Sequence, residues 1–203
     1  MSLGGFLLYG LGWLGFGALH SWSAGPGAKA LFGRWLGRGY RLVYNLVSLA
    51  SFLALMALGR RVAGVETLWQ DAHWSGALGW AQAAAGLLGL AVLALALRGY
   101  DGAGLLGLRP LRGGGEDDDG PLRTGGLNAY VRHPLYSGLL LLIWGMAVTP
   151  LLAATAVWAS LYLAFGIRSE ERRLLARFGA DYGLYRARVP MLIPWRGRVG
   201  QAG

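Results

Sequence analysis

The feature that most constrains this chain is a series of long apolar runs that carry almost no charge. A helix needs roughly 20 mostly apolar residues to cross the hydrocarbon core of a bilayer. We expect a spanning helix in each of residues 3–19, 42–58, 74–97, 136–148 and 151–167. The charged fraction of 14% is also far below that of a typical soluble domain. The sequence therefore predicts an all-α, polytopic membrane helix bundle of about five spans, with four as the alternative because the last two runs are short.

The last two runs are separated only by Thr149-Pro150, which predicts a helical hairpin. Proline removes a backbone donor and disfavours helix in the residue before it, so one helix ends and another begins here. The chain then returns to the side of the membrane from which it came. Residues at the open end of the hairpin are distant in sequence, but we expect them to be neighbours in space.

The basic residues are distributed unevenly among the connections. The connection between the second and third runs holds Arg60 and Arg61, which are offset by Glu66 and Asp71. Every other Lys and Arg lies in the first connection, in residues 98–135 or in the C-terminal tail. The positive-inside rule then places the N-terminus outside and the C-terminus in the cytoplasm. Topology accounts for the net charge of +9, so we expect the bilayer as a partner and no nucleic acid.

Composition excludes several kinds of site. The chain has no cysteine, so it has no disulfide, thiolate metal site or cysteine nucleophile, and we expect no metal. The glycines at 113–115 follow no predicted strand and precede the acidic residues 116–119, which indicates a loop and not a Rossmann nucleotide-binding turn. Other glycines lie inside the apolar runs, where small residues allow helices to approach closely: Gly12, Gly15, Gly17, Gly86, Gly89, Gly138 and Gly145.

Two polar elements flank the expected hairpin. The segment Arg132-His133-Pro134-Leu135-Tyr136 precedes it, and Glu170-Glu171 follows it. Proline suits the first turn of a helix, and a helix N-terminus favours anionic ligand groups. Taken singly, such residues are also ordinary interfacial anchors or solvated ion pairs. Their combination at the open, cytoplasmic end of the expected hairpin predicts a functional site.

These elements resemble a known pattern. Residues 124–138, an apolar stretch and then Glu170-Glu171 are similar to the Arg-His-Pro-x-Tyr and Glu-Glu signature of isoprenylcysteine carboxyl methyltransferases and phospholipid methyltransferases. The resemblance covers residues 98–195. In the N-terminal half, Leu19-His20-Ser21 and Arg41-x-x-Tyr44-Asn45-x-x-Ser48 are similar to the branch of small bacterial membrane proteins that includes NnrU-like proteins and methanethiol S-methyltransferases.

The resemblance implies a methyltransferase of the bacterial inner membrane that uses S-adenosylmethionine on the cytoplasmic side. The acceptor would be a small or lipophilic thiol, carboxylate or amine reached from the bilayer. We expect one membrane domain over residues 1–203. Within it, residues 1–97 form the acceptor side, residues 98–195 the cofactor half, and residues 196–203 a tail.

The resemblance also implies roles for particular residues. Arg132 and His133, with the amides near the helix start, suit the carboxylate of the cofactor, and the two glutamates suit its ammonium or ribose hydroxyls. His133 could instead act as a base. The expected acceptor-site residues are His20 and Tyr44. The expected catalytic residues are Arg132, His133 and Glu170. The expected cofactor site contains Leu127, Tyr130, Arg132, His133, Tyr136, Glu170 and Glu171.

Two alternatives remain open from the sequence. Membrane reductases of related architecture share part of the C-terminal pattern and bind a nicotinamide cofactor. A non-catalytic accessory membrane protein of the NnrU-like kind is the other alternative, although the presence of both halves of the polar pattern argues against it.

Overall fold

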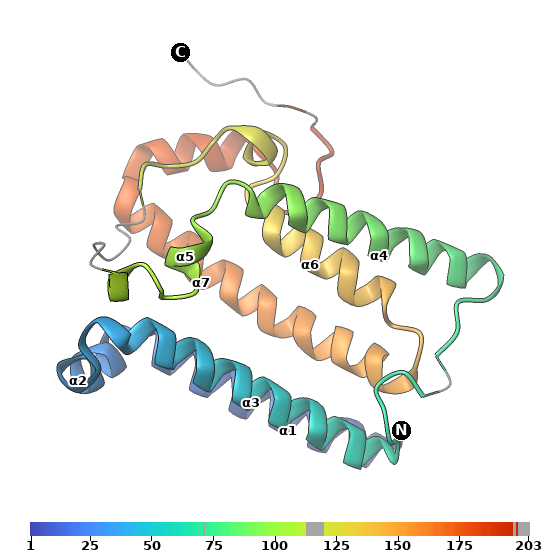
Figure 1. Ribbon diagram of the computed structural model, residues 1–203. Helices are drawn as coiled ribbons and strands as arrows, with labels where there is room; N and C mark the ends of the chain where they lie inside the picture. The colour runs from blue at the N-terminus through green and yellow to red at the C-terminus, as the bar shows by residue number, and fades with distance from the viewer. Residues whose placement is uncertain (71, 113–119, 197, 199–203) are drawn as a thin grey trace. The chain divides into compact units, whose positions relative to one another are not determined.

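The computed structural model describes residues 1–70, 72–112, 120–196 and 198. All regular structure in these ranges is helical, which confirms the all-α prediction. The glycines at 113–115 and the acidic residues 116–119 lie outside the described residues. The elements are α1 (Leu3–Ala24), α2 (Pro26–Leu36), η1 (Gly37–Gly39), α3 (Tyr40–Ala63), α4 (Gly76–Leu97), α5 (Gly102–Leu105), η2 (Pro110–Arg112), η3 (Gly126–Ala129), α6 (Pro134–Gly145) and α7 (Pro150–Arg188) (Figure 1).

Among the described residues, four helical stretches are long and apolar enough to cross a membrane. They are Leu3–Ala24, Pro26–Ala63, Gly76–Leu97 and Pro150–Arg188. The run expected over 136–148 forms α6, whose 12 residues fall short of the roughly 20 that a span needs. The termini lie on opposite sides of the membrane, as predicted, only if α6 crosses it as well, so the number of spans and the orientation of the termini stay predictions.

The chain forms two compact units. The first contains Met1–Asp71, Tyr100–Asp119 and Thr149–Ala154, and the second contains Ala72–Gly99, Gly120–Val148 and Thr155–Gly203. In the first unit α1 packs along α3 because a glycine of one helix faces an aromatic residue of the other. A Cβ on Gly59 would lie 2.8 Å from the ring of Tyr9, which is fully buried.

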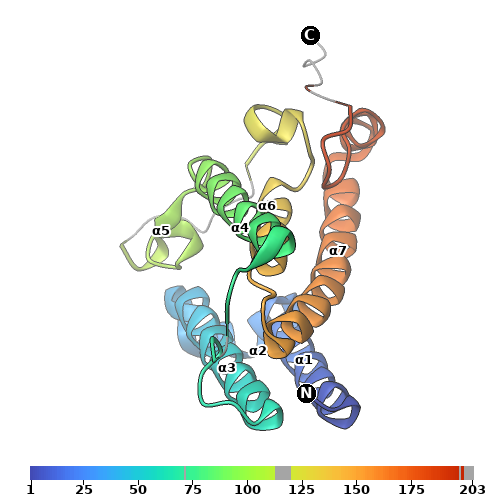
Figure 2. The ribbon, with the colours of Figure 1, turned by 90° about the vertical axis from the view of Figure 1, so that its right-hand side faces the viewer.

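In the second unit α4 packs along α6, and the two helices lie side by side in both views (Figure 1, Figure 2). Glycines make this close approach possible. A Cβ on Gly89 would lie 2.5 Å from the backbone nitrogen of Leu142, and a Cβ on Gly145 would collide with the backbone of Gly86. The Gln82 amide also donates to the carbonyl of Ala147 at 3.0 Å. The prediction that glycines permit close packing is thus confirmed for this pair of helices.

The break between α6 and α7 lies where the sequence predicts it. α7 begins at Pro150, and the Thr149 hydroxyl accepts a hydrogen bond from the nitrogen of Leu152 at 3.2 Å. α7 then runs for 39 residues and changes direction at Gly179, whose φ of 52° and ψ of −123° are not helical. Its apolar part ends at Ile167, so the charged part that follows lies beyond the length that a span requires.

Candidate functional site

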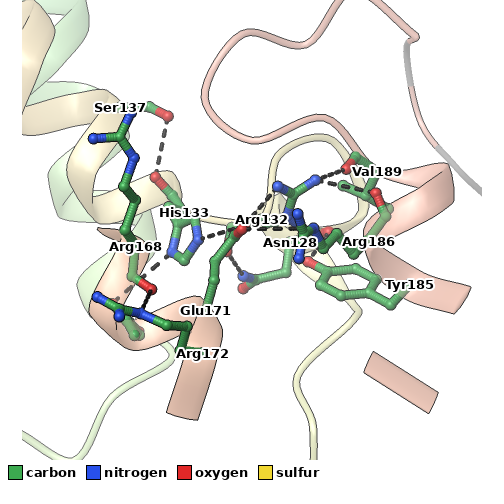
Figure 3. Close-up of polar contacts among 11 residues, drawn as sticks. Asn128, Arg132, His133, Ser137, Arg168, Glu171, Arg172, Tyr185, Arg186 and Val189 are labelled. Carbon is green, nitrogen blue, oxygen red and sulfur yellow. Dashed lines mark hydrogen bonds and ion pairs between the residues drawn. The ribbon is translucent and has the colours of Figure 1, made fainter. Parts of the chain in front are cut away.

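The site is centred on an ion pair between Arg132, two residues before α6, and Glu171 in the charged part of α7 (Figure 3). Arg132 donates from Nε and from Nη2 to Oε1 of Glu171, at 2.7 Å and 2.5 Å. The side chains are only 7% and 8% exposed. Charge-assisted bonds of this kind are among the strongest in proteins, and a buried carboxylate requires such partners. The hairpin therefore brings the two polar elements together as predicted.

His133 extends the cluster to both glutamates. Its Nε2 lies 3.3 Å from Oε1 of Glu171, and its Nδ1 lies 4.0 Å from Oε2 of Glu170. The Glu170 side chain is 31% exposed, whereas the His133 side chain is 4% exposed. The Tyr136 ring stacks at an angle on the imidazole, with 5.6 Å between centroids. The two adjacent glutamates thus differ, because one is enclosed and the other is partly open.

Arg132 also holds the last residues of α7 and the segment that follows them, which together we call the C-terminal strap (residues 186–192). Its Nη1 donates to the carbonyls of Val189 and Arg186, at 2.6 Å and 3.1 Å. The backbone nitrogens of Arg132 and His133 donate to the carbonyls of Pro190 and Met191, at 2.9 Å and 3.1 Å. These two amides, which the sequence suggested for an anionic ligand, are therefore used inside the protein.

The strap is anchored by a small core around the end of α7. Tyr182, Tyr185 and Val189 are buried together there. The Tyr185 hydroxyl donates to the carbonyl of Asn128 at 2.8 Å, and the Asn128 amide donates to the carbonyl of Arg132 at 3.0 Å. Because each of these bonds ends on the backbone near Arg132, the core fixes the position of this residue before any ligand binds.

The electrostatics of the site follow from this enclosure. Burial raises the pKa of Glu171, but the hydrogen bonds and positive charge of Arg132, together with the hydrogen bond to His133, outweigh it and hold the pKa below its ordinary value. Arg186 adds a further cation, with Nε 3.7 Å from Oε2 of Glu171. Glu171 therefore stays ionised at neutral pH. The Glu170 carboxylate lies close enough to the Tyr136 hydroxyl to act on it electrostatically.

The other expected site residues lie as follows. Leu127 belongs to η3, and its carbonyl accepts a hydrogen bond from the nitrogen of Tyr130, whose side chain is 40% exposed. His20 and Tyr44 contact one another, since the Tyr44 hydroxyl lies 2.9 Å from Nε2 of His20. These two residues belong to the first unit, whereas the Arg132 cluster belongs to the second.

The structure adds supporting residues to the site. Arg186, which lies in the stretch that resembles the methyltransferases, is a further arginine beside Glu171, with Nε 3.7 Å from Oε2. The Ser137 hydroxyl bonds the carbonyl of Leu192 at 2.8 Å. Tyr185, Arg186 and Val189-Pro190 lie in the stretch of resemblance, but their spacing in the sequence does not by itself relate them to Arg132.

No metal-binding cluster of three or more His, Cys, Asp or Glu side chains occurs among the residues that the structure describes. The polar groups of the site pair with one another through charge-assisted bonds.

The chain is similar to NnrU proteins and to proteins named as methyltransferases. The family model described as NnrU protein matches residues 8–169. Methanethiol S-methyltransferase 2 of Bradyrhizobium diazoefficiens is 34% identical over 186 residues, which is 88% of this chain and 69% of that protein.

Two further relatives match over shorter stretches. Methanethiol S-methyltransferase of Mycobacterium tuberculosis is 38% identical over 34% of this chain and 29% of its own length. Protein-S-isoprenylcysteine O-methyltransferase of Schizosaccharomyces pombe is 37% identical over 36% of this chain and 33% of its own length. No solved structure matches the chain.

Proposed function

The chain belongs to the NnrU protein family, and from this premise we propose that it is an integral membrane methyltransferase that uses S-adenosylmethionine. The observation that carries the proposal is the unequal environment of the adjacent glutamates. Arg132 and His133 enclose Glu171, and Glu170 remains partly open beside His133. This arrangement holds one carboxylate ready for a cationic ligand group while the other fixes the surrounding structure.

The polar groups present fit the charged end of S-adenosylmethionine, which supplies an activated methyl group on a sulfonium when bound. Its ammonium suits the Glu170 carboxylate, which lies 4.0 Å from the imidazole and belongs to a side chain that is 31% exposed. The hydroxyl of Tyr136 lies on the same side of His133. Four of the five N–H groups of the Arg132 guanidinium already bond the protein, which leaves at most one for the cofactor carboxylate.

We therefore assign different tasks to the expected site residues. Glu170, His133 and Tyr136 face the cofactor, and His133 is oriented by its bond to Glu171. Arg132 and Glu171 position these groups through the strap. Leu127 and Tyr130 stay candidates for the lining next to the cofactor on the turn before α6. Methyl transfer needs alignment and exclusion of water more than a covalent intermediate.

For the acceptor we propose a small thiol reached from the bilayer, with His20 and Tyr44 in the acceptor site. The support is the similarity to proteins named methanethiol S-methyltransferase, one of which aligns over most of this chain. The helices that carry His20 and Tyr44 are among those apolar enough to cross a membrane, which suits an uncharged acceptor. The cofactor site faces the cytoplasm in this proposal, in accordance with the positive-inside rule.

The decisive experiment is titration calorimetry of the detergent-purified protein with S-adenosylhomocysteine. We expect saturable binding that is lost in Glu170→Gln, which removes the charge but keeps the size of the side chain. The matched control is Glu66→Gln, because this glutamate precedes α4 and pairs through its backbone rather than its carboxylate with Gln70. The control should bind as the unmodified protein does.

Each rival predicts a different result. Binding of a nicotinamide dinucleotide without binding of S-adenosylhomocysteine would favour a membrane reductase. A folded protein that binds neither compound would favour an accessory role. Binding that survives Glu170→Gln would remove Glu170 from the cofactor site.

A further inference from the structure

One buried hydroxyl of the second unit has no hydrogen-bond partner among the residues that the structure describes. It belongs to Tyr182, which is only 1% exposed. Tyr182 shares a small core with Tyr185, and the two rings lie 6.0 Å apart. The Tyr185 hydroxyl, by contrast, donates to the carbonyl of Asn128. A buried polar group without a partner destabilises a protein, so the hydroxyl of Tyr182 calls for an explanation.

The Tyr182 hydroxyl lies beside the buried ion pair of the site. Burial and the negative charge of Glu171 raise the pKa of Tyr182 to about 12, and Arg132 acts in the opposite direction. Tyr182 therefore keeps its proton at neutral pH and can donate it in a hydrogen bond. The hydroxyl is a donor close to a carboxylate to which it is not yet bonded.

The two oxygens of that carboxylate are unequally occupied. Oε1 of Glu171 accepts from Nε and Nη2 of Arg132, at 2.7 Å and 2.5 Å, and lies 3.3 Å from Nε2 of His133. Within the described part of the chain, Oε2 has only the ion pair with Nε of Arg186 at 3.7 Å, which is too long for a hydrogen bond. Oε2 can therefore accept from one more donor.

His133 is the donor that Glu171 loses most easily. Its distance of 3.3 Å from Oε1 exceeds the usual length of such a bond, whereas both bonds from Arg132 are short. An anionic ligand group beside His133 would compete with Glu171 for the imidazole. Glu171 would then be enclosed with fewer donors, and a buried carboxylate is stable only when it is well paired and hydrogen-bonded.

We propose that Tyr182 is a positioning residue of the cofactor site and supplies a reserve donor for Glu171, an inference that rests on the proposed function. When His133 turns to the carboxylate of the bound cofactor, the Tyr182 hydroxyl donates to Oε2 of Glu171. This new bond keeps Glu171 in place beside Arg132. Because the bond forms only in the bound state, it shifts the equilibrium toward that state and strengthens cofactor binding.

The test compares Tyr182→Phe with Tyr185→Phe, since both remove one hydroxyl from the same core. Without ligand, Tyr185→Phe should lower the midpoint of thermal unfolding, because the carbonyl of Asn128 loses its partner. Tyr182→Phe should not lower it, because the hydroxyl that it removes is unpartnered. In calorimetry, Tyr182→Phe should nevertheless bind S-adenosylhomocysteine about 10-fold more weakly or worse, as for loss of a hydrogen bond to a charged group.

This combination distinguishes a positioning role from a structural one, because a structural hydroxyl would contribute to the stability of the free protein as well. Infrared difference spectra follow the new bond directly. Addition of S-adenosylhomocysteine should shift a C–O stretching band of tyrosine. The shifted band should be missing in Tyr182→Phe and present in Tyr185→Phe.

Two results would overturn this inference and leave the proposed function intact. If Tyr182→Phe does not fold, or loses as much stability as Tyr185→Phe, the hydroxyl already supports the free protein. If Tyr182→Phe binds S-adenosylhomocysteine as tightly as the unmodified protein does, the hydroxyl does not act in the bound state. Absence of binding by the unmodified protein refutes the proposed function, and the role of Tyr182 with it.

Discussion

Replacing Arg132 by methionine should destabilise the protein far more than removal of an ordinary arginine. The substitution leaves the Glu171 carboxylate, 8% exposed, without its main partner and removes two bonds to strap carbonyls. Removing one partner of a buried ion pair typically costs about 3–5 kcal/mol. The cost here should lie in this range, since Arg186 at 3.7 Å compensates only in part.

A double-mutant cycle with Glu171 tests this prediction further. When both charges are replaced by apolar side chains, the desolvation cost disappears as well, and such replacements are often neutral or stabilising. Arg132→Met with Glu171→Leu should therefore be more stable than Arg132→Met alone. The measured coupling between the two positions should exceed the roughly 0.5 kcal/mol within which independent sites add.

Equilibrium unfolding in mixed detergent, followed by tryptophan fluorescence, gives the free energies, and hydrogen exchange at residues 186–192 reports the strap directly. The matched control is Arg172→Met, because this arginine is exposed and bonds only weakly to the carbonyl of Arg168. Surface substitutions usually stay within about 0.5 kcal/mol. If Arg132→Met is no less stable than the control, or the strap exchanges no faster, the buried pair does not hold this region.

Three other substitutions or conditions test the remaining structure. Gly89→Ala should lower stability by about 1–3 kcal/mol, as overpacking does, because its Cβ would lie 2.5 Å from a backbone nitrogen of α6. The control is Gly15→Ala, where nothing lies within 4 Å of the new Cβ, and thermal unfolding should show no such loss for it. Because its pKa is lowered in the folded protein, ionised Glu171 contributes to the free energy of unfolding. This contribution is complete above the ordinary Glu pKa of about 4.3 and is lost as the pH falls through the pKa of Glu171 in the folded state. Melting curves from pH 7 to 3 should therefore fall more steeply for the unmodified protein than for Glu171→Gln. Gly179→Ala should lower the free energy of unfolding by about 1–3 kcal/mol, because alanine rarely adopts the φ of 52° found there. A greater helical signal in circular dichroism without loss of stability would contradict this prediction.

Much of the architecture could be predicted from local properties of the sequence. Length and apolarity identify a membrane helix because each residue in a bilayer must satisfy its own backbone bonds. Thr149-Pro150 marks the break between α6 and α7 because proline acts on the residues next to it. The proximity of Arg132 to Glu171 followed from these two facts alone, since a chain that reverses must bring its flanks together.

Which helix packs against α6 could not be predicted in the same way. The hairpin connects α6 to α7, and a bond from Trp144 to Ser160 at 3.0 Å joins the two helices, but the glycines of α6 face α4. Which helix offers the complementary surface depends on both partners. A glycine pattern in one helix does not specify the other.

The sequence by itself determined the class of this protein, the position of the helix break and the identity of the polar groups at the hairpin mouth. Only the tertiary structure decided that Glu171 is enclosed while Glu170 stays partly open, and that the donors of Arg132 point to the strap. The reason is that apolar length and proline geometry act within a few residues. A hydrogen bond depends on the distance and angle between groups far apart in the chain, so packing of the whole unit decides which pairs form.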